Sequence, residues 1–306
     1  MVRYLANRLF RSAMAIVGIL IVVFFILHLT GDPVRLMLPP QASEEDYVAM
    51  KKALGMDKPL GEQFLHYMLG ALHGDFGKSL RFRGQSAMEL VTERFPATLQ
   101  LAFAALVISV VLSVPLGLIA AVKRYSIWDN LAMSIALVGQ AMPNFWLALL
   151  LISVFAVKLR WLPSSGRSGV HSLILPAVTL ALFMVARTTR LVRSSMLEVL
   201  GEDYIRTARG KGLHEWAVNV RHALRNAALP VVTVIGLDLG TLMGGAVVTE
   251  TVFAWPGIGF LAVGSIYVRD FPVVQAVVFF TALFFVVINL AVDLLYGVLD
   301  PRIRLT

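Results

Sequence analysis

Six apolar runs, each long enough to cross a membrane as a helix, constrain the fold of this chain more than any other feature. About 20 consecutive apolar residues span the hydrocarbon core of a bilayer. The runs cover residues 12–29, 98–122, 132–157, 172–191, 229–249 and 272–296. Charged residues make up 15% of the 306 residues, against about a quarter in soluble domains. The sequence predicts an all-α, polytopic membrane protein with six transmembrane helices.

The first run follows three arginines, as the apolar segment of a signal peptide does: Arg3, Arg8 and Arg11. Its apolar core is longer than that of a signal peptide, and no small-residue cleavage site follows it. We therefore expect it to be retained as the first membrane helix.

The distribution of Lys and Arg predicts the orientation of the helices. Cytoplasmic loops carry an excess of both residues. With the N-terminus in the cytoplasm, the inner loops and termini carry 15 of them and the two short outer loops carry 4. Both termini are then cytoplasmic. The net charge of +8 is explained by this orientation rather than by binding of nucleic acid, and we expect no nucleic-acid partner.

The long outer loop, residues 30–97, is predicted to be a folded extracytoplasmic segment. "SEEDYVAMKKALG" begins with a Ser N-cap and an acidic first turn and ends at a Gly, and "PLGEQFLHYMLGALHG" follows the same plan. Both stretches predict short amphipathic helices.

"HGDFGKS" in the outer loop ends like a phosphate-binding loop. That loop needs a Gly five residues before the Gly of its Gly-Lys pair, but Leu72 stands there. The sequence therefore predicts no nucleotide site in this chain. It has no cysteine, and its six histidines lack ligand spacing, so we expect no metal site either.

Polar residues and glycines inside the predicted membrane helices mark candidate positions for packing and transport. Pro115 and Pro143 favour kinks. Gln140 and Asn144 lie four residues apart and are expected on one helix face, where they serve interhelical hydrogen bonding or line a pathway. We assign a candidate translocation pathway to four residues: Gln140, Asn144, Asp238 and Thr241. Asp238, near mid-membrane, either lines the pathway or has a structural partner.

The fifth apolar run contains a glycine stripe that favours close helix packing. Its members recur every four residues: Gly236, Gly240 and Gly244.

A basic, polar stretch between the fourth and fifth runs predicts a cytoplasmic interaction site. "EDYIRTARGKGLHEWAVNVRHALRN" begins at Glu202 and predicts a short helix that ends at Gly210 and Gly212. A second, amphipathic helix is expected to carry one apolar face, formed by Leu213, Trp216, Ala217, Val220 and Leu224. A membrane-surface helix has a similar composition. The small tip, residues 208–212, favours insertion into a protein cleft.

This stretch resembles the coupling loop of the integral-membrane permease subunits of ABC importers. Their shared pattern is Glu-Ala-Ala, three residues, then Gly. Gly212 fits the glycine, and Arg206-Thr207-Ala208 keeps only the last Ala of the pattern. "RTARGKG" followed by "RHALRN" resembles the branch that imports peptides, glutathione or nickel. Arg225 departs from the Leu-Pro pair of many relatives.

Further motifs of the same branch occur in its order along the chain. They are "GDP" at 31–33, "GDFGKS" at 74–79, "FPATL" at 95–99, "WLP" at 161–163, "ETVFAWPGIG" at 250–259 and "DPRIR" at 300–304. The resemblance thus covers essentially the whole chain, residues 1–306, as a single permease domain.

The resemblance implies a multi-subunit importer in the bacterial cytoplasmic membrane, with this chain as one multi-pass, non-enzymatic subunit. The implied partners are a homologous second permease, two ABC ATPases, an extracytoplasmic binding protein and membrane lipid. ATP and Mg²⁺ are expected on the ATPases, and no cofactor on this chain. The cytoplasmic coupling loop is residues 192–228, and its implied ATPase contacts are Arg206, Thr207, Ala208, Arg209, Gly210, Lys211, Gly212 and Leu213.

The implied cargo is a dipeptide or short oligopeptide, with glutathione or nickel as alternatives. The turn at 255–259 is expected near the outer mouth of the pore, and the outer loop is expected to receive the binding protein. Two other classes are a stand-alone secondary carrier or channel, suggested by Asp238 and Gln140, and a membrane-embedded enzyme, which would need converging acid, base or metal groups.

Overall fold

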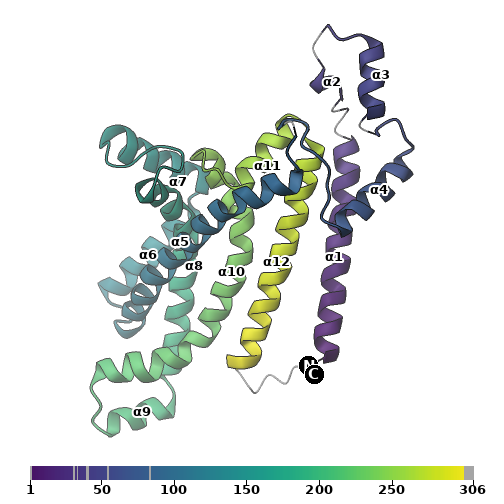
Figure 1. Cartoon of the computed structure of the whole chain (residues 1–306). Coiled ribbons are helices and arrows are strands. Elements are labelled where there is room, and N and C mark those ends of the chain that lie inside the picture. Colours follow the sequence, from purple (N-terminus) through teal and green to yellow (C-terminus); the bar gives the residue numbers. More distant parts are fainter. Residues whose placement is uncertain are drawn as a thin grey trace. The chain divides into compact units, whose positions relative to one another are not determined.

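The computed structural model describes residues 2–29, 32, 34–38, 41–53, 55–82 and 84–299. Side chains are described over these ranges except at 2–6, 36, 37, 241, 243, 245 and 293–299. The described part of the chain is helical, with one isolated antiparallel bridge between Lys78 and Ser86. Figure 1 shows the helices.

The elements follow one another in this order: α1 (Val2–Leu29), α2 (Val34–Met37), α3 (Glu44–Ala53), α4 (Leu60–Leu72), α5 (Ala87–Val122), α6 (Ile127–Ala141), α7 (Asn144–Leu151), the π-helix η1 (Ile152–Lys158), α8 (Val170–Leu200), α9 (Asp203–Gly210), the π-helix η2 (Ala217–Ala223), α10 (Leu224–Val252), α11 (Ile258–Tyr267) and α12 (Phe271–Leu299).

The predicted apolar helices are present: five as single helices, and the third along the chain as a bent pair. Five segments are long and apolar enough to cross a membrane: Asn7–Leu29, Ala87–Val122, Val170–Leu200, Ala217–Gly240 and Phe271–Val292. The sixth is a bent pair, Ile127–Ala141 followed by Asn144–Lys158, whose axes differ by 104°. α5 continues through Pro115 as a helix.

The break between α6 and α7 corrects two expectations. Met142 and Pro143 both have extended backbone, so the helix predicted over 132–157 stops and restarts. Proline disfavours helical conformation in the residue before it and lacks an N–H to continue the ladder. Gln140 lies in the last turn of α6 and Asn144 begins α7, so they do not share a helix face.

The chain forms two compact units. The first contains the chain up to Thr98 together with Pro256–Val287, and the second contains Leu99–Trp255 and the part of α12 from Ile288. α5 and α12 each contribute to both units.

The first unit is held by an apolar cluster that joins α4 to α1. Phe24 of α1 stacks on Tyr67 of α4 with ring centroids 5.5 Å apart. Leu20 of α1, Ala71 of α4 and Phe76 belong to the same cluster. Its remaining buried members come from α5, α11 and α12: Ala87, Leu90, Val91, Ile258, Leu261, Val273, Ala276 and Val277. Burial of this apolar surface stabilises the unit.

The two short helices predicted in the outer loop are present as α3 and α4. Ser43 caps α3 reciprocally: its Oγ accepts from the Asp46 N–H (3.2 Å), and the Asp46 carboxylate accepts from the Ser43 N–H (3.0 Å). Hydrogen bonds from the Ser43 hydroxyl and backbone N–H hold the pKa of Asp46 below its usual range.

The segment resembling a phosphate-binding loop holds an anion of its own chain. The buried carboxylate of Asp270 accepts hydrogen bonds from the Ser79 hydroxyl (2.5 Å) and from the backbone N–H groups of Leu80 (3.1 Å) and Arg81 (3.2 Å). Asp270 directly precedes α12, so these bonds fasten the loop to that helix within the first unit. The hydroxyl that ends the stretch and the two N–H groups that follow it are thus occupied by a carboxylate.

The second unit is built around α8, which packs against α6, α7 and α10 (Figure 1). Two glycines allow neighbouring helices to approach it closely. A Cβ on Gly117 of α5 would lie 2.6 Å from the Val192 Cβ, and one on Gly139 of α6 would lie 3.2 Å from the Leu182 Cγ.

The glycine stripe of α10 has unequal surroundings within this unit. A Cβ on Gly236 would lie 2.8 Å from the Val292 Cγ2 of α12. Gly240 is buried. A Cβ on Gly244 would meet open space in the described part of the chain.

Candidate functional site

The predicted cytoplasmic site is a short helix, α9, mounted on the core of the second unit. Ile205 and Ala208 of α9 are buried in a cluster with Met196 of α8 and with Val218 and Ala223 of η2. Figure 1 shows α9 at the end of the unit where α8 ends and η2 leads into α10. A force on α9 therefore acts on the ends of two membrane helices.

The tip after α9 is a closed turn. The Lys211 N–H donates to the Thr207 carbonyl (3.0 Å), and the Gly212 N–H donates to the Arg209 carbonyl (2.9 Å). Gly212 has φ of +76°, a conformation that glycine adopts without the cost an L side chain carries. The guanidinium of Arg209 donates to both oxygens of Glu215 (2.8 and 3.3 Å) across the turn. The predicted helix end at Gly210 and Gly212 is confirmed.

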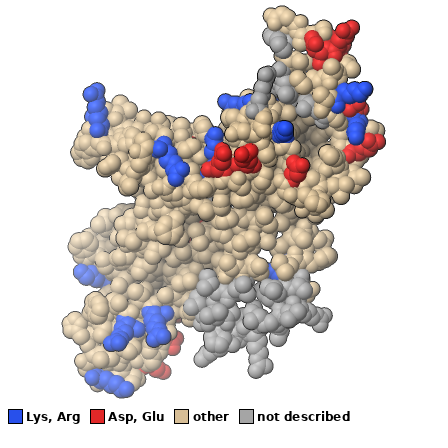
Figure 2. Space-filling view, in the orientation of Figure 1, with Lys and Arg blue, Asp and Glu red and all other residues tan. Residues whose placement is uncertain are grey.

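The outer surface of this site is polar and basic. Of the eight residues predicted to contact an ATPase, Ala208 is buried and the others are exposed: Arg206, Thr207, Arg209, Gly210, Lys211, Gly212 and Leu213. Figure 2 shows Lys and Arg side chains gathered at this end, with acidic groups beside them.

The apolar face predicted for the second helix of the site is wrong. Trp216 is 67% exposed, and the buried apolar residues are Val218, Ala223 and Ala227. η2 is a π-helix, which bonds residues five apart, so Val218 and Ala223 come to one side where an α-helical period would separate them. In α10 the spacing of buried residues returns to four, from Ala223 to Ala227.

Three arginines at intervals of three residues connect α8 to its neighbours, through partners that the sequence pattern does not predict. Arg187 donates to Asp238 of α10, Arg190 donates to Gln140 of α6, and Arg193 donates to Asp129 of α6. The signal was present as three regularly spaced cations in or beside an apolar run.

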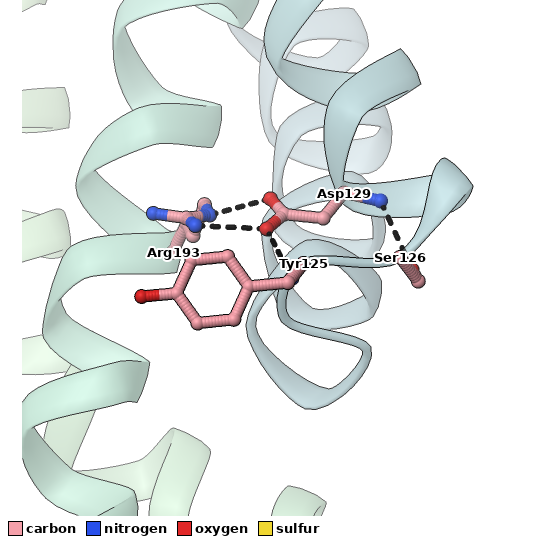
Figure 3. A network of polar contacts seen from close by, with 4 residues as sticks. All are labelled: Tyr125, Ser126, Asp129 and Arg193. Carbon is pink, nitrogen blue, oxygen red and sulfur yellow. Dashed lines mark hydrogen bonds and ion pairs between the residues drawn. The ribbon is translucent and has the colours of Figure 1, made fainter.

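In the pair of Arg193 and Asp129, both oxygens of the carboxylate are bonded and the arginine side chain is 23% exposed (Figure 3). Nε and Nη2 of Arg193 donate to the two carboxylate oxygens over 2.6 and 2.8 Å. The carboxylate also accepts from the Tyr125 N–H (2.9 Å), and Ser126 caps α6 by accepting from the Asp129 N–H (3.4 Å). The Asp129 side chain is 3% exposed. This arrangement ties the start of α6 to α8.

The pair of Arg187 and Asp238 is open on one side. Nη1 of Arg187 lies 2.8 Å from Oδ1 of Asp238, whose side chain is 5% exposed, whereas that of Arg187 is 46% exposed. Asp238 sits at the midpoint of α10. Of the candidate pathway, the structure thus brings Asp238 and Gln140 to neighbouring arginines of α8. Asn144 lies at the start of α7, partly exposed, and the Thr241 side chain lies outside the described residues.

Comparisons with known proteins agree across the whole chain. The family described as "Binding-protein-dependent transport system inner membrane component" matches residues 113–305, and its N-terminal companion matches residues 1–102. The chain is 42% identical to the dipeptide transport system permease protein DppB of Escherichia coli (strain K12), over 99% of each sequence. It is 43% identical to the glutathione transport system permease protein GsiC of the same strain, again over 99% of each.

Solved structures show the same fold. A chain of the inward-facing MetNI methionine ABC transporter aligns with a TM-score of 0.60 at 21% identity, covering 70% of this chain and 97% of the other. A chain of an amino acid ABC transporter solved with histidines aligns with a TM-score of 0.52 at 16% identity, covering 68% and 92%. The chain belongs to the family of binding-protein-dependent transport system inner-membrane components, the permease subunits of ABC importers.

Proposed function

We propose that this chain is a pore-forming subunit of an ATP-driven importer of short peptides, coupled to partner ATPases through α9. The observation that carries the proposal is the construction of α9: an exposed, closed tip mounted on a buried base. Membership of the permease family supports it, as does the likeness to a dipeptide permease.

In this proposal the tip enters a cleft on an ATPase and transmits its movement. Ile205 and Ala208 are packed against Met196 and Val218, and tightly packed groups move together rather than deform. When the ATPases close on ATP, α9 would carry the ends of α8 and α10 with it. The membrane helices then switch between inward-open and outward-open arrangements by rigid-body rotation.

The remaining assignments follow from the same proposal. The segment 192–228 and both termini lie in the cytoplasm, and the loop 30–97 faces the binding protein. A second permease completes the pore. The pathway runs past Gln140, Asn144, Asp238 and Thr241. The chain itself is not an enzyme and binds no cofactor: ATP and Mg²⁺ belong to the ATPases.

Glutathione is a second candidate substrate, favoured by the length of the alignments. The match to the dipeptide permease extends over 337 positions, 31 more than this chain contains, so the relative has segments that this chain lacks. The match to the glutathione permease extends over 305 positions and needs no such gap. Glutathione is itself a tripeptide, so both candidates share one chemical class.

Cross-linking tests the docking proposal directly, since the chain has no cysteine and each introduced thiol is unique. Thr207→Cys and Lys211→Cys place thiols on the tip, and Lys52→Cys on the exposed face of α3 is the matched control. With a thiol-reactive photo-cross-linker in intact membranes, the tip variants should capture an ATPase and the control should not. Equal capture by all three, or none by the tip variants, contradicts the proposal.

Uptake distinguishes the candidate substrates. Proteoliposomes containing the whole transporter with its binding protein should accumulate a radiolabelled dipeptide, glutathione, or both in the presence of ATP. Accumulation of neither would refute peptide import.

A further inference from the structure

One uncovered stripe runs along α8, the most buried of the candidate membrane helices. From Pro176 to the end of the helix, the exposed residues are Phe183, Arg187, Arg190, Ser194 and Glu198. Their spacings of four, three, four and four place them on one side of an α-helix. The other sides are covered by the remaining helices of the second unit.

The composition of this stripe decides what it faces. Lipid does not accommodate exposed arginines at mid-membrane, because a charge in hydrocarbon is costly. Arg187 lies opposite the midpoint of α10, through its contact with Asp238. A polar stripe at this depth faces water or a ligand, which in a permease is the transport pathway.

The charge presented by the stripe is positive. Asp238 neutralises one arginine in part but is itself buried, with Oδ1 against Arg187, while Arg190 is held by the neutral amide of Gln140. Within the described residues, each of these two guanidinium groups has one hydrogen-bond partner, although arginine carries five N–H donors. Two adjacent planar donors with open N–H groups match a carboxylate.

We propose that Arg187 and Arg190 form a carboxylate-binding site in the translocation pathway, which receives the C-terminal carboxylate of the peptide. The site would recognise a group that every peptide carries and ignore the side chains, as a carrier of varied peptides requires. Asp238 is then a positioning residue that orients Arg187. This proposal rests on the proposed function, because it presumes peptide transport.

Paired charge removal tests the site. Arg187→Gln combined with Asp238→Asn removes both charges and leaves no buried carboxylate unpaired, and Arg190→Gln removes the second cation. The matched control is Arg193→Gln combined with Asp129→Asn. In proteoliposomes containing the whole transporter, dipeptide uptake per ATP hydrolysed should fall about tenfold or more for the first two variants, the scale of a lost charge-assisted hydrogen bond. The control should stay near the wild type.

The outcomes separate the proposal from its alternatives. Wild-type uptake by the Arg187→Gln, Asp238→Asn variant would show a purely structural pair and overturn the site. Loss of the second permease on copurification would show that the arginines pair with that subunit, and would also overturn it. Absence of dipeptide uptake by the wild-type transporter would refute the proposed function instead.

Water access gives a readout that does not depend on transport. Phe183→Cys and Ser194→Cys flank the arginines on the stripe, and Val192→Cys lies on the buried side as the control. A charged, membrane-impermeant methanethiosulfonate should label the first two and spare the third. Lack of labelling at both stripe positions would place the stripe against lipid or protein and contradict the proposal.

Discussion

Two arginine–aspartate pairs on α8 lie six residues apart and differ in how completely they are closed. Arg193 donates hydrogen bonds to both carboxylate oxygens of Asp129, which also accepts one from the Tyr125 N–H (Figure 3). Arg187 uses a single nitrogen on Asp238 and leaves nearly half of its side chain exposed. Both carboxylates are buried, so the difference lies in the arginines.

The comparison separates a structural ion pair from one that is open to a ligand. A buried carboxylate needs a partner in either case, because an unpaired charge is costly away from water. Where the guanidinium is mostly enclosed and donates to both carboxylate oxygens, the pair fastens two helices. Where the cation is exposed, donors remain for another anion. Four predictions test this difference, from the largest expected effect to the smallest.

Removing Arg193, the arginine bonded to both oxygens of its aspartate, should cost the most stability. Arg193→Ala leaves the Asp129 carboxylate buried without its bidentate partner, and we expect a loss of about 3 kcal/mol, toward the lower end for broken buried pairs. Thermal unfolding of the purified transporter in detergent measures this loss. Arg190→Ala, which removes an exposed cation from a neutral amide, is the control and should shift the transition little. Equal shifts of the unfolding temperature in the two variants would show that burial of the arginine's partner does not determine its contribution to stability.

The covered side of α8 should tolerate no added volume. Gly117→Val would place its side chain against Val192, one residue before Arg193, where even a Cβ lies 2.6 Å away. Overpacking of this kind costs about 1–3 kcal/mol. Gly244→Ala, which meets open space in the described structure, is the control. If Gly117→Val unfolds at the wild-type temperature, α5 and α8 are not in close contact.

Neutralising the open pair should cost less than breaking the closed one. Asp238→Asn retains a side-chain oxygen that can accept a hydrogen bond from Arg187, and the Arg187 side chain is partly exposed. We expect a loss of about 1.5 kcal/mol, near the upper limit for single polar contacts between membrane helices. Asp129→Asn is the comparison and should cost more, because Arg193 then loses a bidentate partner. The reverse order in thermal unfolding would invalidate the distinction between the two pairs.

The α9 tip gives the same contrast between a constrained and an unconstrained position on a smaller scale. Gly212→Ala has space for its methyl group but must adopt a φ of +76°, which costs about 1 kcal/mol. Gly210→Ala also has space, without that constraint, and should be neutral or slightly stabilising. Amide hydrogen exchange at residues 207–213 reports the difference. Equal protection in the two variants would mean that the turn does not depend on Gly212.

Local sequence patterns predicted much of this molecule. Run lengths predicted the membrane helices because span length is set by bilayer thickness. Ser43 and the glycines at 210 and 212 predicted where short helices begin and end, since caps depend on neighbours within a few residues. Family motifs predicted the location of α9.

The features that depend on neighbouring helices were not predictable in this way. The 104° bend at Pro143 separates Gln140 from Asn144, and the π-winding of η2 turns Trp216 outward. Asp270 occupies the loop that resembles a phosphate site. The arginines of α8 acquired their partners only when α6 and α10 packed beside them.

Composition and contacts a few residues apart were enough to predict the class of this protein, most of its helices and its short caps. Packing of the helices was needed to establish which buried charges pair and which cation stays open. The physical reason is that a charge is satisfied by whatever lies within about 3 Å in space, and for Arg187 that group is 51 residues away along the chain.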